Sequence, residues 1–201
     1  MELTNVFGEL VERLRQKKPV VHAITNYVTA ESCADVALAA GASPVMADEP
    51  EEVEEITAGA DALVLNLGTI SFNKQIAMER AVAVAKTKGI PVVLDPVGVM
   101  ASKMRLNFAL QLLNKGYIDI VRGNFSECNA LLTGSTGGHG VDNLEGDTEE
   151  GVALKVAKEA AKKFNCVFAL TGAIDNISMA SRLWFSIMVI PCCRILPVVA
   201  V

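Results

Sequence analysis

Several sequence patterns that mark common enzyme and binding classes are missing from this chain of 201 residues. No GxGxxG follows the first apolar run, which argues against a dinucleotide-binding dehydrogenase, and no GxxxxGK[ST] marks a P-loop kinase. The GxSxG elbow of serine hydrolases is absent as well. The net charge of −5 argues against a protein that must contact many nucleic-acid phosphates. A small phosphorylated ligand held by one or two cations is still compatible with this charge.

Cysteine and histidine are also used in a way that excludes some functions. The five cysteines form no CxxC pair and have no metal-ligand spacing with His22 or His139. His139 lies in the Gly-rich stretch 133–148, where a solvated loop residue is the simplest interpretation. The odd number of cysteines and the charged first residues predict a reducing, cytoplasmic compartment. No run reaches the ~18 apolar residues of a membrane span, so we expect no membrane partner.

What the sequence does contain is a regular alternation of apolar runs and helix-like runs between residues 19 and 171. The expected strands are Val20–Ile24, Ser43–Met46, Ala62–Leu67, Val92–Leu94, Ile118–Val121 and Cys166–Leu170. The expected helices are Glu31–Ala40, Lys74–Lys88, Lys103–Asn114 and Glu149–Phe164. This alternation predicts an α/β fold of one domain or at most two, with right-handed βα units around a mostly parallel sheet flanked by helices.

The segment Arg122–Glu127, RGNFSE, lies where an expected strand ends and a helix begins. A guanidinium followed by a carboxylate at such a junction suits a metal-bound phosphate, because ligands collect at the carboxyl ends of parallel strands and helix N-termini favour anions. Asn124 and Glu127 also have the spacing of a capping box, which needs no ligand. The two interpretations are compatible.

Small or polar residues follow each of the six expected strands. Each such end alone is explained by a turn or a cap, but six at one edge of a parallel sheet predict a ligand crevice. Asp95 and Glu127 are candidate oxygen ligands for Mg²⁺, which binds one or two carboxylates together with substrate phosphates. With Arg122, they favour phosphoryl transfer to a small alcohol by positioning and charge neutralisation.

Six segments in register closely resemble the hydroxyethylthiazole kinase family over roughly residues 10 to 178. They read VVHAITNYVTA, GASPVMAD, ALVLNLGT, PVVLDPVG, VRGNFSE and FALTGAID. The resemblance implies a ribokinase-like α/β fold and a role in thiamine biosynthesis or salvage. It further implies transfer of the ATP γ-phosphate, with Mg²⁺, to the hydroxyl of 4-methyl-5-(2-hydroxyethyl)thiazole. Members of the family are homotrimers that bind the thiazole between neighbouring subunits.

The resemblance also assigns site residues, position by position. The residues on the substrate side are Asn26, Met46 and Gly68. The residues that contact ATP are Arg122, Asn124 and Thr171. The carboxylates that organise Mg²⁺ are Asp95 and Glu127. Within the matched region, Ala173 stands where the family usually has Glu, and Met100 where a small residue is common.

The resemblance stops after Ser178, so we expect a kinase domain over residues 1–178 and an aberrant hydrophobic tail over 179–201. The family continues through an Asn-Gly-His hairpin to a Gly-Cys motif, which supplies an anion hole and the cysteine that activates the hydroxyl. Cys192 and Cys193 lack the flanking glycines of that motif, so no catalytic residue is assigned and this chain is expected to have impaired activity.

A frameshift near Met179–Leu183 is one hypothesis for the tail. The codons of Trp184–Arg194, reread two bases later, can encode Val-Phe-Asn-Asn-Gly-His-Pro-Leu-Leu-Ser, which is similar to the family's hairpin. The other hypothesis is a genuine hydrophobic interaction segment. Two alternative functions also stay open, namely a non-catalytic module that binds nucleotide or thiazole, and another ribokinase-like small-molecule kinase.

Overall fold

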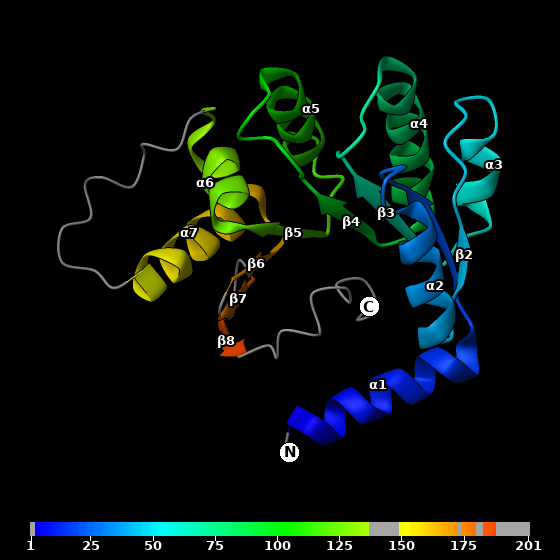
Figure 1. Cartoon of the computed structure of the whole chain (residues 1–201), viewed down its shortest axis with the longest axis horizontal. Coiled ribbons are helices and arrows are strands. Elements are labelled where there is room, and N and C mark those ends of the chain that lie inside the picture. The colour runs from blue at the N-terminus through cyan, green and yellow to red at the C-terminus, as the bar shows by residue number, and fades with distance from the viewer. Residues whose placement is uncertain (1–2, 137–148, 173, 180–182, 188–201) are drawn as a thin grey trace. The chain divides into compact units, whose positions relative to one another are not determined.

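The computed structural model describes residues 3–136, 149–172, 174–179 and 183–187 (Figure 1). These residues form two compact units. Unit 1 holds residues 3–65 and 71–92, and unit 2 holds residues 66–70 together with the described residues from 93 onward. No helix in the described part of the chain is long and apolar enough to cross a membrane.

Unit 1 contains three parallel strands in the order β2-β1-β3. Their bounds are β1 Val20–Ile24, β2 Ser43–Val45 and β3 Ala62–Asn66, the last residue of β3 falling in unit 2. The helices of this unit are α1 Leu3–Lys17, α2 Ala30–Ala40, α3 Val53–Ala58 and α4 Phe72–Lys88. Helix α3 packs against α4 (Figure 1), and the side chains of Leu63 and Leu65 in β3 are fully buried.

Unit 2 is built on strands in the order β4-β5-β6-β7-β8, of which the first three are parallel and the last two antiparallel. Their bounds are β4 Val92–Asp95, β5 Ile120–Asn124, β6 Val167–Thr171, β7 Asp175–Ser178 and β8 Leu183–Ile187, the first residue of β4 falling in unit 1. The helices are α5 Lys103–Asn114, α6 Phe125–Thr133 and α7 Glu149–Phe164, with α6 packed against α7 (Figure 1).

Local chemistry explains where these helices begin and end. Ser71 precedes α4 and its hydroxyl accepts a hydrogen bond from the Lys74 amide at 3.2 Å, as an N-cap does. Gly89 ends the same helix in a left-handed conformation, φ +68°, which glycine adopts without steric cost. Gly41 ends α2 in the same way, at φ +106°. The sequence places glycines at these helix ends, and the structure confirms them.

The six expected strands and four expected helices are all present; β1, α5 and α7 have the expected bounds, and the other elements begin or end one or more residues away. β5 starts two residues later than expected and runs on to Asn124. The reason is pairing, because Arg122, Gly123 and Asn124 lie in register with residues 169–171 of β6. The sequence analysis places residues 122–124 after the end of this strand, whereas in the structure they are its last residues paired with β6. Helices α1 and α3 were not among the expected elements. The predictions made for His139, Ala173, Cys192 and Cys193 concern residues outside those that the structure describes.

Candidate active site

Asp95 and Arg122 lie side by side in unit 2, at the ends of the neighbouring strands β4 and β5. The Arg122 Nη1 atom is 3.6 Å from Asp95 Oδ2, and Asn66 Nδ2 donates a hydrogen bond of 3.0 Å to the same oxygen. Two other atoms of the pair, Asp95 Oδ1 and Arg122 Nε, are buried and have no hydrogen-bond partner among the described residues. Buried polar atoms are normally paired, so these two are candidates for contact with a ligand.

The surroundings of the Asp95 carboxyl disfavour its charged form. Its pKa is raised from an ordinary 3.8 to about 6, mainly by burial away from water and in smaller part by the negative charge of Glu127. The positive charge of Arg122 and the hydrogen bond from Asn66 act in the opposite direction, but they do not compensate for desolvation. A divalent cation at this carboxylate would favour its charged form.

Asn124 and Glu127 form the capping box that their spacing predicts, at the start of α6. Asn124 Oδ1 accepts a hydrogen bond of 2.9 Å from the Glu127 amide, and Glu127 Oε2 accepts one of 2.9 Å from the Asn124 amide. Glu127 Oε1 also accepts a bond of 3.3 Å from the amide of Gly98. Each carboxylate oxygen has two lone pairs, of which these hydrogen bonds use one, so a metal ion is chemically compatible with the capping box.

The side chain of Arg105 holds two strand-end loops of unit 2 together. Its Nη2 donates to the carbonyl of Gly68 at 2.7 Å, and its Nη1 donates to the carbonyl of Val97 at 3.1 Å. Gly98 adopts φ +75°, and a Cβ atom there would lie only 2.5 Å from Arg105 Nη1. The loop after β4 therefore needs a glycine at this position, both for its conformation and for the approach of the guanidinium.

Thr171 and Gly123 complete the arrangement in unit 2. The Thr171 hydroxyl donates to the carbonyl of Gly123 at 3.3 Å, which ties the last residue of β6 to β5. A Cβ atom at Gly123 would lie 3.2 Å from both Glu127 Oε2 and Pro96 Cγ. The absence of a side chain at Gly123 therefore lets the strand pass close to the capping carboxylate.

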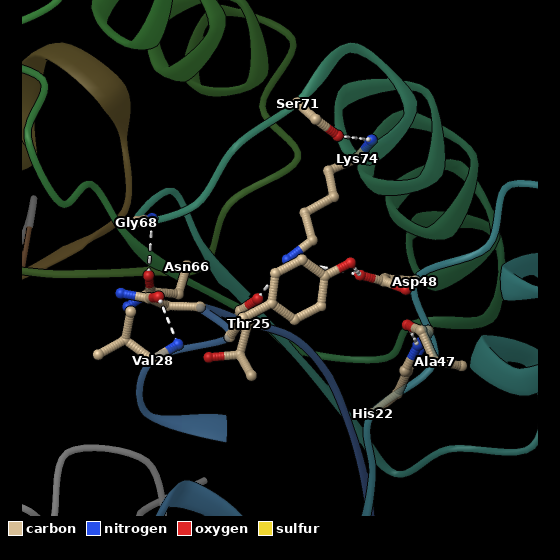
Figure 2. Close-up of polar contacts among 11 residues, drawn as sticks. His22, Thr25, Val28, Ala47, Asp48, Asn66, Gly68, Ser71 and Lys74 are labelled. Carbon is tan, nitrogen blue, oxygen red and sulfur yellow. Dashed lines mark hydrogen bonds and ion pairs between the residues drawn. The ribbon is translucent and has the colours of Figure 1, made fainter. Parts of the chain in front are cut away.

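Asn26 and Met46 belong to unit 1, whereas Gly68 belongs to unit 2. Asn26 follows β1, and its Oδ1 accepts a hydrogen bond of 3.0 Å from the amide of Val28, which makes a tight turn (Figure 2). Met46 follows β2 and is half-buried. Gly68 donates its amide to Asn66 Oδ1 at 2.8 Å (Figure 2).

The donor set in unit 2 fits magnesium together with a phosphate. The described residues contain no group of three or more His, Cys, Asp and Glu side chains able to hold a metal by themselves. Mg²⁺ does not require one, because it usually takes one or two carboxylates and completes its shell with phosphate oxygens and water. Asp95 Oδ1 and Arg122 Nε, which have no hydrogen-bond partner within the described ranges, are a suitable first metal ligand and a suitable phosphate donor, respectively.

Comparison with protein-family models shows the family of the chain. The model of the hydroxyethylthiazole kinase family matches residues 11–190. This chain belongs to the hydroxyethylthiazole kinase family. A relative named hydroxyethylthiazole kinase from Ruminiclostridium cellulolyticum is 44% identical over 177 residues, which cover 88% of this chain and 65% of the relative. The chain thus spans about two thirds of the length of the curated relatives it matches, 65% of this one and 64% of one from Pyrococcus horikoshii.

Solved structures agree with the family and with the expected fold. The hydroxyethylthiazole kinase structure from Pyrococcus horikoshii superposes with a TM-score of 0.79 at 39% identity, covering 89% of this chain and 65% of that one. An ADP complex of Bacillus subtilis pyridoxal kinase superposes with a TM-score of 0.57 at 13% identity, covering 86% and 75% of the two chains. The expectation of a ribokinase-like α/β fold is confirmed.

Two cationic residues that hold strand-end loops, Lys74 and Arg105, were not among the predicted site residues. Both lie on helices whose charged residues are usually solvated. One signal for Lys74 was present, because it occupies the first position of a stripe spaced three and four apart with Ala77, Met78 and Ala81, all of which are buried. A lysine on the apolar face of a helix needs a partner, and this pattern predicts one.

Proposed function

We propose that this chain is, by family, an ATP-dependent kinase that phosphorylates the hydroxyl of 4-methyl-5-(2-hydroxyethyl)thiazole, with impaired activity in this chain. The observation that carries the proposal is a pair of buried atoms at adjacent strand ends, Asp95 Oδ1 and Arg122 Nε, for which the described part of the chain provides no hydrogen-bond partner. Family membership supports the choice of the thiazole as acceptor and of thiamine biosynthesis or salvage as the pathway.

The residues of unit 2 have complementary roles in this proposal. Arg122, Asn124 and Thr171 bind and orient the ATP phosphates. Asp95 and Glu127 hold Mg²⁺, which neutralises phosphate charge when bound. Since phosphoryl transfer depends mainly on alignment and charge neutralisation, these residues act by fixing the γ-phosphate rather than by forming a covalent intermediate.

Asn26, Met46 and Gly68 are each proposed to contact the substrate, as the family resemblance implies. A thioether packs well against a sulfur-containing aromatic ring, which suits Met46 to a thiazole. The amide of Asn26 and the backbone of Gly68 offer hydrogen-bonding groups that fix the orientation of a small polar ligand.

None of the described residues is proposed as the base that activates the hydroxyl. Cys128 is buried, and its thiol pKa is raised far above the ordinary range by desolvation and by the negative charges of Glu127 and Asp95. A thiol in that state supplies no thiolate at neutral pH. In this proposal the described residues provide binding, orientation and metal ligation, and little turnover by the 201-residue chain stays a prediction.

Calorimetry with MgATP and with hydroxyethylthiazole, each titrated separately, tests the binding roles. We expect both ligands to bind, and we expect Arg122→Met to weaken MgATP binding at least about tenfold while thiazole binding is kept. Lys86→Met, which removes an exposed positive charge from α4, is the matched control and should alter neither affinity. Failure of the wild-type chain to bind either ligand contradicts the proposal.

A coupled ADP-release assay with hydroxyethylthiazole tests turnover in the same preparation. Turnover by the 201-residue chain near that of a full-length relative would overturn the prediction that no catalytic residue lies in it. Binding of both ligands with little turnover agrees with the proposal.

We also propose that the protein is a cytoplasmic homotrimer, as the family resemblance implies. Helix α2 supports a subunit contact, because none of its residues is buried although its sequence, AESCADVALAA, is largely apolar. Leu38 of α2 is 59% exposed. Sedimentation velocity should show Leu38→Glu as a smaller species than the wild type. Met104→Glu, at a residue of α5 that is 47% exposed, should leave the assembly unchanged.

A further inference from the structure

The side chain of Lys74 in unit 1 is almost completely buried, with 3% of its surface exposed. Lysine is rarely buried to this extent unless its charge is paired. Lys74 lies in the first turn of α4, and its side chain reaches away from the helix toward the residues that follow β1 and β2 (Figure 2).

The ammonium of Lys74 contacts three groups from those two loops. Its Nζ donates to the carbonyl of Thr25 at 2.6 Å and lies 3.4 Å from Asp48 Oδ2 (Figure 2). It also lies 3.5 Å from the centroid of the Tyr27 ring, within the range of a cation–π interaction. The Tyr27 hydroxyl donates to Asp48 Oδ2 at 2.6 Å, which links the two loops a second time.

These partners flank the proposed substrate residues in sequence. Thr25 and Tyr27 stand on either side of Asn26, and Asp48 follows Met46 by two residues. The residue between Met46 and Asp48 is fixed as well, because the carbonyl of Ala47 is bonded to His22 Nε2 at 2.9 Å (Figure 2). One cation thus sets the relative position of two loops that lie about twenty residues apart in the chain.

Stability alone does not account for a buried ion pair in this place. Replacing both members of such a pair by neutral groups of similar size is often neutral or stabilising, since the cost of desolvation cancels much of the attraction. The directional contacts of Lys74, by contrast, define one arrangement of the loops and exclude others.

We propose that Lys74 is a positioning residue that preforms the substrate side by locking the loop of Asn26 to the loop of Met46. The inference rests on the proposed function for the identity of the ligand, a small hydroxyalkyl thiazole. It does not depend on that function for the loop arrangement itself, which can be measured without ligand.

The test compares Lys74→Met, the double variant Lys74→Met/Asp48→Asn, and the control Lys86→Met, which removes an exposed charge from the same helix. Three quantities are measured on the intact chain, namely hydroxyethylthiazole affinity and MgATP affinity by calorimetry, and amide exchange of peptides covering 25–28 and 46–49. Urea unfolding of each variant reports overall stability.

We expect Lys74→Met to weaken thiazole binding about tenfold or more and to speed exchange in both loops, with MgATP affinity within about twofold of wild type. The double variant should regain stability, because no buried charge is left unpaired, while thiazole affinity and loop protection stay low. Lys86→Met should match wild type in every measurement.

Two results would overturn the inference. One is a double variant that binds thiazole as tightly as wild type, and the other is unchanged exchange in both loops of Lys74→Met. If the single variant does not fold, the double variant carries the test. If wild type itself binds no thiazole, the proposed function fails, and the exchange measurement alone still decides whether Lys74 locks the loops.

Discussion

The two units of this protein differ in how fully their buried charged groups are paired. In unit 1, the Lys74 ammonium has a carbonyl, a carboxylate and an aromatic ring around it. In unit 2, the Arg122 guanidinium is 3.6 Å from Asp95, and each of these residues keeps one buried polar atom without a partner among the described residues. A satisfied cluster fixes its surroundings, whereas an unsatisfied one is suited to receive a ligand.

Two left-handed glycines, one in each unit, give the largest expected contrast in stability. Gly89→Ala in unit 1 meets open space at φ +68°, so only backbone strain is expected, about 1 kcal/mol. Gly98→Ala in unit 2 has similar strain at φ +75° but also displaces Arg105 from its two carbonyl partners. We expect a loss of about 3 kcal/mol. Urea unfolding measures both, and equal losses would show that the Arg105 contact contributes nothing.

Asp95→Asn is expected to stabilise the protein. Because the folded pKa of Asp95 is raised to about 6, the folded state binds a proton more tightly than the unfolded state, and stability falls as pH rises from about 4 to about 6. Removing the charge should raise the free energy of unfolding by about 2 kcal/mol near neutral pH and flatten this slope. Thermal unfolding of both proteins across this range measures the effect. If Asp95→Asn is less stable than wild type at neutral pH, the charged Asp95 carboxylate does not destabilise the folded state.

Helix caps provide a smaller contrast between the units. Asn124→Ala and Ser71→Ala each remove an N-cap hydrogen bond, at the starts of α6 and α4, and each should cost about 1 kcal/mol. Only Asn124→Ala should also weaken MgATP binding, since Asn124 is proposed to contact phosphate. Unfolding and calorimetry separate the two outcomes. Equal MgATP affinity for both variants would leave Asn124 as a cap alone.

A pH effect of opposite sign is expected from His22 in unit 1. Burial lowers the pKa of His22, whose ring is bonded to Thr57 Oγ1 at 2.8 Å and to the carbonyl of Ala47. The unfolded state therefore binds the proton more tightly, and the contribution of neutral His22 is lost as pH falls below about 6.5. When the pH is lowered from just above 6.5 to well below it, the free energy of unfolding should fall less in His22→Gln than in wild type. If urea unfolding gives the same dependence of stability on pH for both proteins, His22 is not a neutral, buried imidazole in the folded state.

The sequence predicts the strands well because their apolar runs are continuous, as they are in sheets covered on both faces. It also predicts the capping box, whose partners lie three residues apart in one local turn. The ends of β5 and β6 were placed too early, because polar residues 122–124 and 171 owe their strand conformation to pairing with each other's strands. Local sequence contains no information on such pairing.

Lys74 and Arg105 were missed for a related reason. The partners of Lys74 lie 49 and 26 residues away, and those of Arg105 lie 37 and 8 residues away. Spacing along one helix indicates which face a residue occupies, but not which distant carbonyl group it will bond in the folded protein. The resemblance to the family supplied the site residues that residue patterns alone left as caps and turns.

The central claim is that Asp95 and Arg122 form the metal and phosphate half of a kinase site, and paramagnetic resonance of Mn²⁺ tests it most directly. Mn²⁺ prefers the same oxygen ligands as Mg²⁺, and its signal reports whether the ion is immobilised on the protein. With ATP present, we predict immobilised Mn²⁺ for the wild-type chain, loss of that signal in Asp95→Asn, and a reduced signal in Arg122→Met. Equal signals from all three proteins would contradict the account.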